Sequence, residues 1–270
     1  MMRTLVHVSD VHFGHLDHAT LAPLVGSARA AQPSLVVVSG DLTQRARTRE
    51  FQEARAFLDE LPRPQIVVPG NHDVPLFNPL ARFWRPLKKF CRYITSDLEP
   101  FYADGEIAVL GLNTARSLTI KGGRLNHEQL QRTRERFAGI GPEVVKIVVT
   151  HHPFDLPESH AHEEVVGRSD EAMEVFAACG IDLFLAGHLH VIHASLTAER
   201  YAIGGHSALV VQAGTATSSR VRGEANSFNV LHVELPTIHV ERHTWDPAAG
   251  VFAVTATERF RRDGSGWQPE

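Results

Sequence analysis

The chain has 270 residues, of which 43% are hydrophobic, and a formal net charge of −4. This length suits one large domain over residues 1–270 and is too short for two full-sized domains with a linker. The acidic balance excludes a general attraction to nucleic acid or anionic membranes, and no apolar stretch approaches the roughly 20 residues that span a bilayer. The N-terminus lacks the pattern of a secretory signal, so we expect a cytoplasmic protein.

Five short apolar runs, rich in Val, Ile and Leu, predict strands that are buried on both faces. They are residues 5–9, 34–39, 64–69, 145–150 and 181–186. Between the first three runs, residues 18–31 and 47–60 predict crossover helices. The N-terminal part of the chain is therefore expected to form a βαβαβ unit.

Residues 79–97 break this alternation with mixed aromatic and basic side chains, and we interpret them as an insertion or lid near the site. Phe83, Trp84 and Phe90 in this segment could stack on a base or form a lid or dimer contact. Ordinary packing is the favoured interpretation for all three aromatic side chains.

The second half of the chain continues with a strand-like run at residues 106–114 and a helix that follows Asn126 as its N-cap. A further helix is predicted near residues 169–179. From residue 192 onward, short alternating segments separated by Gly and Pro turns predict an antiparallel second sheet.

Each of the five apolar runs ends at residue types that bind metals. These residues are Asp10 and His12, Asp41, Asn71 and His72, His151 and His152, and His188 and His190. In open α/β sheets, ligands bind outside the carboxyl ends of the strands, so five such strands would bring these side chains into one crevice. One motif alone would be weak support, but five together predict a two-metal hydrolase.

The residues around Asn71 indicate how such a site would work. Asn71 offers a neutral carbonyl oxygen to a metal, His72 can act as a general acid or stabilise charge, and Asp73 can orient the His72 imidazole. Two adjacent histidines cannot readily bind one metal from the same strand face. We therefore predict His151 as a ligand and place His152 in the substrate cleft or in the surroundings of the metal.

Seven protein ligands suffice for two ions only if one carboxylate bridges them. Two dications about 3.5 Å apart repel by about 20 kcal/mol at an effective dielectric constant near 20, so an anionic oxygen must lie between them. Asp41 is the natural bridge, and a bridging hydroxide is the predicted nucleophile. The mixed ligand set suits Mn, Fe, Zn or Co.

The ordered motifs resemble those of the calcineurin-like metallophosphoesterase superfamily. The resemblance implies a four-layer α/β/β/α sandwich of two mixed β-sheets flanked by helices, with a dinuclear site between the loop ends of the sheets. It also implies that His72 lies near the leaving-group oxygen. The implied ligands are Asp10, His12 and His190 for the first metal, Asn71, His151 and His188 for the second, and Asp41 for both.

Within the superfamily, the chain length, the His-His-Pro at residues 151–153 and the segment 214–228 are similar to the class III cyclic-nucleotide phosphodiesterase branch. This similarity implies a phosphodiesterase that acts on small molecules such as cyclic nucleotides or glycerophosphodiesters. Arg220 and Arg222 are candidate phosphate contacts.

Other functions stay open. A nuclease or phosphomonoesterase of the same superfamily and a noncatalytic scaffold are the alternatives, although the acidic balance disfavours a nucleic-acid polymer as substrate. A homodimer is expected only as the commonest oligomer of soluble proteins.

Overall fold

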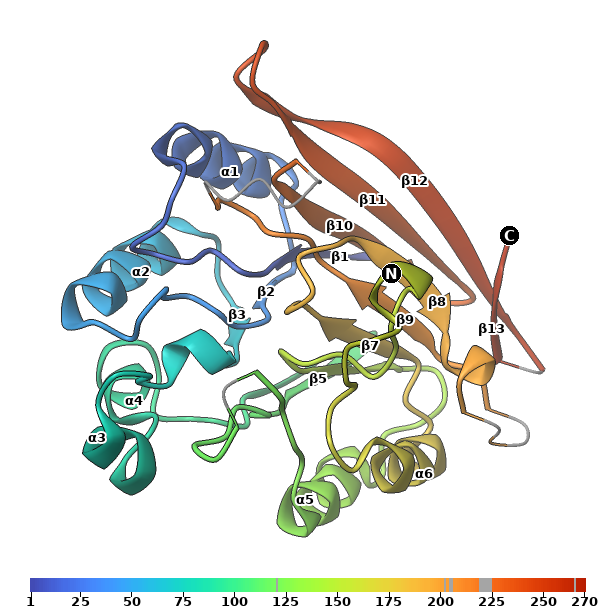
Figure 1. The fold of residues 1–270 in the computed structure, drawn as a ribbon. Helices are drawn as coiled ribbons and strands as arrows, with labels where there is room; N and C mark the ends of the chain where they lie inside the picture. The colour runs from blue at the N-terminus through green and yellow to red at the C-terminus, as the bar shows by residue number, and fades with distance from the viewer. Residues whose placement is uncertain (120, 202, 204–205, 219–224, 265) are drawn as a thin grey trace.

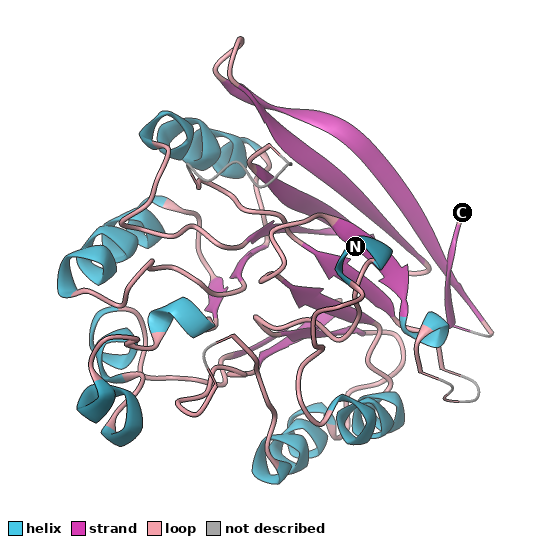
Figure 2. Ribbon diagram, in the orientation of Figure 1, coloured by secondary structure: helices cyan, strands magenta, loops and turns pink. Residues whose placement is uncertain are grey.

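The computed structural model describes residues 1–119, 121–201, 203, 206–218, 225–264 and 266–270 (Figure 1). Two β-sheets pack face to face, and helices cover the outer face of each sheet (Figure 2). This arrangement confirms the predicted four-layer sandwich of two mixed sheets. None of the described helices is both long and apolar enough to cross a membrane.

The first sheet has seven strands in the order β13-β12-β11-β10-β1-β2-β3. The strands β1, β2 and β3 run parallel to one another, and β10 to β13 continue the sheet in antiparallel pairs from the other edge of β1. The bounds are β1 Arg3–Val8, β2 Leu35–Val38, β3 Gln65–Val67, β10 Ser227–Glu234, β11 Thr237–Asp246, β12 Val251–Asp263 and β13 Gly266–Pro269.

The second sheet has six strands in the order β4-β5-β6-β7-β9-β8. The strands β5, β6, β7 and β9 are parallel, and the edge strands β4 and β8 are antiparallel to their neighbours. The bounds are β4 Phe101–Ala103, β5 Ile107–Gly111, β6 Val145–Val149, β7 Leu183–Ala186, β8 His193–Leu196 and β9 Leu209–Gln212.

Three apolar clusters hold the four layers together. The middle cluster fills the space between the sheets, where Leu5 and Val37 of the first sheet pack with Ile147 of the second. The two outer clusters lie beneath the helices, as Phe51 and Phe176 illustrate. Strands of the central parallel units are buried on both faces, which explains their unbroken Val and Leu runs.

The helices fall into two outer groups (Figure 1). The first group covers the β1-β2-β3 side and includes α1 and α2, while α5 and α6 pack together on the second sheet. The bounds are α1 His18–Ala30, α2 Thr48–Glu60, α3 Pro79–Trp84, α4 Lys88–Tyr93, α5 His127–Phe137 and α6 Ser169–Cys179, with short 3-10 helices η1 Asn71–Asp73, η2 Glu158–His160 and η3 Thr197–Glu199.

The structure corrects the prediction that the segments after residue 192 form an antiparallel second sheet of their own. The strands β10 to β13 extend the first sheet, and β9 pairs in parallel with β7 in the second. Alternating hydrophobicity predicts a strand with one buried face, but it does not specify the neighbouring strand.

The segment 79–97 forms α3, α4 and their connections. Phe90 of α4 is fully buried and belongs to the apolar cluster that also contains Phe51 of α2. Phe83 and Trp84 are instead 60% and 81% exposed, so the packing predicted for these two side chains is wrong.

Candidate metal centre

The carboxyl ends of five strands from the two sheets meet at one edge of the sandwich. The strands β1, β2 and β3 come from the first sheet, and β6 and β7 come from the second. Each is followed directly by the predicted metal-binding residues, and η1 carries Asn71 and His72. The two sheets are joined here by a hydrogen bond of 3.0 Å from the backbone N–H of His188 to Oδ2 of Asp10.

One group of ligand atoms gathers around Asp10. Its Oδ1 lies 3.6 Å from Nε2 of His12 and 3.5 Å from Nε2 of His190. The second oxygen of Asp10 accepts a hydrogen bond of 2.6 Å from Ser9 Oγ, which leaves Oδ1 facing the two imidazoles. Nδ1 of His190 forms a hydrogen bond with Thr215 Oγ1, which orients the ring.

A second group gathers around Asn71. Its Oδ1 lies 3.0 Å from Nε2 of His151 and 3.1 Å from Nδ1 of His188, and these two nitrogens are 3.3 Å apart. The other ring nitrogen of His151 donates to the carbonyl of Ser39 at 2.8 Å. In the neutral ring, this bond places the proton on Nδ1 and leaves the lone pair of Nε2 directed at the group.

Asp41 lies between the two groups. Its Oδ2 is 3.8 Å from Nε2 of His12 and 3.4 Å from Nε2 of His151. Its Oδ1 accepts a hydrogen bond of 2.8 Å from the backbone N–H of His72. Asp41 therefore lies where a ligand shared between the two groups would have to lie.

The charges of these buried groups are strongly coupled. Burial opposes a charge on His151, but the Asp41 carboxylate outweighs it and raises the pKa of His151 to about 9. Burial and the nearby His151 lower the pKa of His188 to about 3. His188 is thus already in the neutral form that binds a metal, whereas a cation must displace the proton of His151.

The backbone is unusual at five of the seven predicted ligands. Non-glycine residues seldom adopt a positive φ, and such conformations cost about 1–3 kcal/mol each when the surrounding structure imposes them. The φ angles are 53° at Asp10, 55° at His12, 51° at Asp41, 77° at His188 and 62° at His190. Strain of this kind concentrates where side-chain positions matter for function.

The donor set suits a cation. Buried polar atoms are normally hydrogen-bonded, yet Oδ1 of Asp10 and both ring nitrogens of His12 have no hydrogen-bond partner within the part of the chain that the structure describes. These atoms belong to the group around Asp10, where oxygen and imidazole donors meet. A divalent ion of the Mn, Fe, Zn or Co type would satisfy Oδ1 of Asp10 and Nε2 of His12, the ring nitrogen that faces Asp10 and Asp41.

The ring of His72 is oriented by Gln44 and not by Asp73, contrary to the sequence-based prediction. His72 Nδ1 lies 2.9 Å from the carbonyl oxygen of Gln44. Asp73 instead accepts hydrogen bonds from the backbone N–H groups of Thr43 and Gly70, both at 2.9 Å. It therefore fastens the loop after β2 to the loop after β3.

Asp73 is a buried carboxyl group beside another carboxylate. Burial and the Asp41 charge raise the pKa of Asp73 to about 6, against the hydrogen bonds from Gly70 and Thr43. By joining the two loops, Asp73 keeps Asp41, which lies on the first loop, close to Asn71, which lies on the second.

His152 lies close to His151 and His188, but both of its ring nitrogens already form hydrogen bonds. Nδ1 is 2.7 Å from Thr114 Oγ1, and Nε2 is 2.7 Å from the carbonyl oxygen of Lys121. The side chain is buried, so of the two predicted places for His152 this geometry favours the surroundings of the metal over the substrate cleft. Arg220 and Arg222, the other two predicted substrate contacts, lie outside the described residues.

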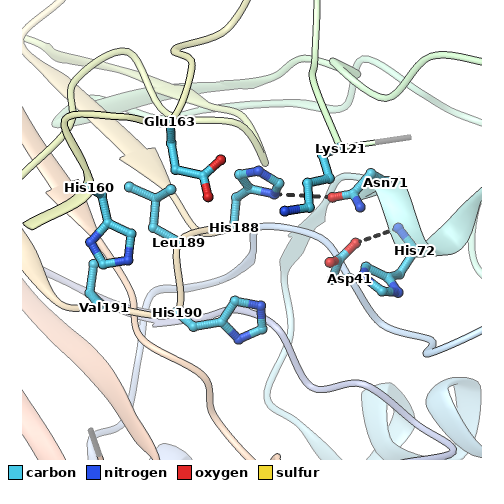
Figure 3. Close-up of a pocket in the computed structure, with 10 residues that line it drawn as sticks. All are labelled: Asp41, Asn71, His72, Lys121, His160, Glu163, His188, Leu189, His190 and Val191. Atoms are coloured by element: carbon cyan, nitrogen blue, oxygen red, sulfur yellow. Dashed lines mark hydrogen bonds between the residues drawn. The ribbon is translucent and has the colours of Figure 1, made fainter. Parts of the chain in front are cut away.

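A pocket of about 250 Å³ opens over the predicted ligands (Figure 3). Its wall includes Asp41, Asn71, His72, His188 and His190. Three further polar residues that the sequence analysis did not single out also line it, namely Lys121, His160 and Glu163. Lys121 and Glu163 stand on loops and His160 ends η2. None of the three belongs to a motif, so only the fold reveals their place.

Comparison with known sequences agrees with this geometry. A family model described as calcineurin-like phosphoesterase matches residues 3–192, a range that contains all seven predicted ligands. "Glycerophosphodiester phosphodiesterase GpdQ" of Enterobacter lignolyticus is 35% identical over 165 residues, which cover 56% of this chain and 58% of that protein. A "Probable cyclic nucleotide phosphodiesterase" of Synechococcus sp. is 26% identical over 202 residues, covering 70% of this chain and 74% of the relative. Both names agree with the resemblance to the class III phosphodiesterase branch.

A solved structure supports the fold. The purple acid phosphatase PPD1 of yellow lupin (Lupinus luteus) superposes with a TM-score of 0.73 at 12% sequence identity. The superposition covers 97% of this chain and 54% of the lupin enzyme. At this identity the similarity concerns the four-layer architecture alone.

Proposed function

The chain belongs to the calcineurin-like phosphoesterase family, and from this premise we propose that it is a metal-dependent phosphoric ester hydrolase that cleaves small phosphodiesters at a pair of metal ions. The observation that carries the proposal is the position of Asp41. One carboxylate oxygen lies within 4 Å of a ring nitrogen from each ligand group, at 3.8 Å from His12 and 3.4 Å from His151. A site for one ion would not need a carboxylate between two sets of donors.

The seven residues divide between two ions. Asp10, His12 and His190 would hold one, Asn71, His151 and His188 would hold the other, and Asp41 would contact both. When bound, two divalent ions neutralise charge on a phosphate group and lower the pKa of water, which is the chemistry that phosphoester hydrolysis needs. Manganese, iron, zinc and cobalt all accept this ligand set.

His72 is the proposed group at the leaving alkoxide. It lines the pocket beside Asp41 and Asn71 (Figure 3). Nδ1 of His72 lies 2.9 Å from the carbonyl oxygen of Gln44, to which it can only donate, and 3.2 Å from the side-chain amide nitrogen of Gln44, from which it could only accept. The shorter contact favours the tautomer with the proton on Nδ1. In that tautomer, Nε2 of His72 is the nitrogen that can exchange a proton with a substrate oxygen.

Three facts support a small diester as substrate. The pocket of about 250 Å³ is slightly smaller than the usual range of ligand sites, which begins at about 300 Å³. The chain carries a formal net charge of −4, which disfavours a polyanionic nucleic acid. Two relatives are named as phosphodiesterases, one for glycerophosphodiesters and one for cyclic nucleotides.

The test is a substrate panel with the manganese-loaded protein. Bis-p-nitrophenyl phosphate, glycerophosphodiesters, cyclic AMP, p-nitrophenyl phosphate and single-stranded DNA are compared by kcat/KM, with metal content measured on the same sample. We expect the small diesters to be hydrolysed best. Preference for the monoester or for DNA would replace the proposal with a phosphatase or a nuclease, and no turnover with two ions bound would favour a scaffold.

The proposed role of His72 has its own test. His72→Ala should slow diesters with poor alkoxide leaving groups by about 100- to 10,000-fold, the usual contribution of a general acid. Esters of p-nitrophenol should be affected far less, because this leaving group departs without a proton. Equal losses on both kinds of ester would contradict the role.

A further inference from the structure

The loop that begins at Lys121 supplies a cation to the metal pocket. Lys121 lines the same pocket as Asp41, Asn71 and His188, and Figure 3 shows its side chain extending into the pocket beside Asn71 and His188. Across the described part of the chain, no carboxylate forms an ion pair with the Lys121 ammonium. The charge is therefore available to a ligand.

The backbone of Lys121 is held in place by the buried ring of His152. A carbonyl oxygen can only accept, so Nε2 of His152 donates to Lys121 over 2.7 Å, and Nδ1 must accept the 2.7 Å hydrogen bond from the hydroxyl of Thr114. His152 directly follows the predicted ligand His151. One rigid connection thus runs from the metal centre to the loop.

The same loop is fastened at two further points. The N–H of Arg124 donates to the carbonyl of Thr114 at 3.0 Å, and the N–H of Gly167 donates to the carbonyl of Gly123 at 2.8 Å. A Cβ atom at Gly123 would overlap the ring of His152, so this close approach requires glycine. The anchoring is more extensive than a solvated surface lysine would need.

The pocket lining also includes a carboxylate. Glu163 lies with His160 on the segment around η2, on the other side of His188 from Lys121 in Figure 3, and 3.8 Å from Nε2 of the exposed His162. An anionic phosphate group is repelled by Glu163 and attracted by Lys121. These two side chains therefore favour one orientation of an ester, with its phosphate oxygens toward Lys121.

We propose that Lys121 binds a nonbridging oxygen of the substrate phosphate and that His152 is the positioning residue that holds Lys121 there. The assignment rests on the proposed phosphoesterase function and adds a cationic contact to the seven ligands and His72. Hydrogen bonds to charged groups contribute enough for a loss of roughly 10- to 100-fold in affinity when they are removed.

The experiment measures binding and turnover separately in the manganese-loaded full chain. Inorganic phosphate is titrated into the protein by calorimetry, and kcat/KM is measured with the best diester. Lys121→Gln should weaken phosphate binding and lower kcat/KM by roughly 10- to 100-fold at unchanged metal content. Lys121→Arg should restore part of both, and Lys88→Gln, at an exposed lysine of α4, should change neither by more than about twofold.

The role of His152 is tested through Lys121. His152→Gln should weaken phosphate binding to the level of Lys121→Gln, and the double variant should be no weaker than either single variant. If His152→Gln does not fold, Thr114→Val removes the hydroxyl that orients the ring and takes its place. Additive losses would show that His152 does not act through Lys121.

The outcomes separate this inference from the proposed function. A wild-type protein that hydrolyses no ester contradicts the function, while phosphate binding still decides the assignment of Lys121. Phosphate affinity in Lys121→Gln within twofold of the wild type, or no phosphate binding by the wild type, would overturn the inference.

Discussion

The backbones of Gly70 and Asp41 approach each other closely, and this approach helps to position the Asp41 carboxylate. A Cβ atom at Gly70 would overlap both the carboxylate and the backbone nitrogen of Asp41. The N–H of Gly70 also donates to Asp73 at 2.9 Å, so the loop cannot move away without losing that bond. Glycine is therefore required here for spatial reasons, at a residue that binds no metal itself.

Gly70→Ala should lower the free energy of unfolding by about 1–3 kcal/mol, as overpacking in a closely packed region does, and should reduce bound manganese below two ions per chain. Urea unfolding and metal analysis measure the two effects. Gly26→Ala in α1 is the matched control, because no atom lies within 4 Å of the added Cβ. It should stabilise the protein by about 0.5–1 kcal/mol. A Gly70→Ala protein with wild-type stability and two ions would contradict the packing argument.

The sequence predicted which residues gather at this site because metal ligands need particular side chains at strand ends. All seven predicted ligands lie together in the structure, although their role as ligands remains a prediction. Gln44 and Lys121 were not predicted. The shorter contact of Gln44 with His72 is made by its backbone carbonyl, which every residue type has, and its side-chain amide adds a contact of 3.2 Å. Lys121 resembles any exposed lysine until the fold places it.

At the level of elements, Asp155 ties the loop after β6 to β8 and to the residue that follows η3. It accepts a hydrogen bond of 2.6 Å from Ser195, and it lies 3.4 Å from both His193 and Arg200. Burial opposes ionisation of Asp155, but the hydrogen bonds from His193 and Ser195 outweigh it and lower the pKa of this carboxyl group. The loop that carries His160 and Glu163 begins at this anchor.

Because its pKa is lowered by folding, the Asp155 carboxylate stabilises the folded state. This stabilisation is complete above the pKa of the unfolded state, near pH 4, and it is lost as the pH falls through the pKa of the folded state. Asp155→Asn should therefore cost about 1 kcal/mol at pH 7 and less at pH 3. Urea unfolding at both pH values measures the difference, with exposed Glu143→Gln as the control. If Asp155→Asn lost more unfolding free energy at pH 3 than at pH 7, the predicted pH dependence would be wrong.

The helices α3 and α4 show two opposite environments within one segment. Phe90 of α4 is fully buried, whereas Trp84 of α3 is 81% exposed. Phe90→Ala should cost about 3–5 kcal/mol of unfolding free energy, and Trp84→Gln should change it by no more than about 0.5 kcal/mol. Thermal and urea unfolding of the two variants check this, and a large loss for Trp84→Gln would mean that α3 packs elsewhere.

Element boundaries were predictable where one physical signal dominates. Continuous Val and Ile runs predicted β1, β2, β3, β6 and β7 because strands buried on both faces need them. The pairing of β10 with β1 was not predictable from the same signal, since alternation is equally satisfied by any neighbour that covers the apolar face. The exposure of Trp84 was not predicted, because aromatic residues occur both in cores and on surfaces.

At the scale of the whole molecule, the two sheets meet at the candidate metal centre, so bound ions should stabilise the complete fold. The predicted ligands after β1, β2 and β3 belong to one sheet and those after β6 and β7 to the other. An ion held by His12 and His190, or by Asn71 and His151, would join the two. Ligands that bind only the folded state shift its stability by mass action.

Manganese at 100 times its dissociation constant should add about 2.7 kcal/mol per ion to the free energy of unfolding, and a chelator should reverse the gain. Melting temperature as a function of manganese concentration measures this effect. The Asp41→Asn protein should gain clearly less unfolding free energy from manganese, because the proposed shared ligand is weakened. A wild-type melting temperature that does not respond to manganese or to chelation would contradict the link between the centre and the fold.

The most direct test of the two-metal centre is anomalous scattering from crystals of the manganese-loaded protein. We predict two peaks about 3.5–4 Å apart, with the Asp41 carboxylate in contact with both. One peak should lie among Asp10, His12 and His190, and the other among Asn71, His151 and His188. A single peak, or two peaks without Asp41 between them, would contradict the account.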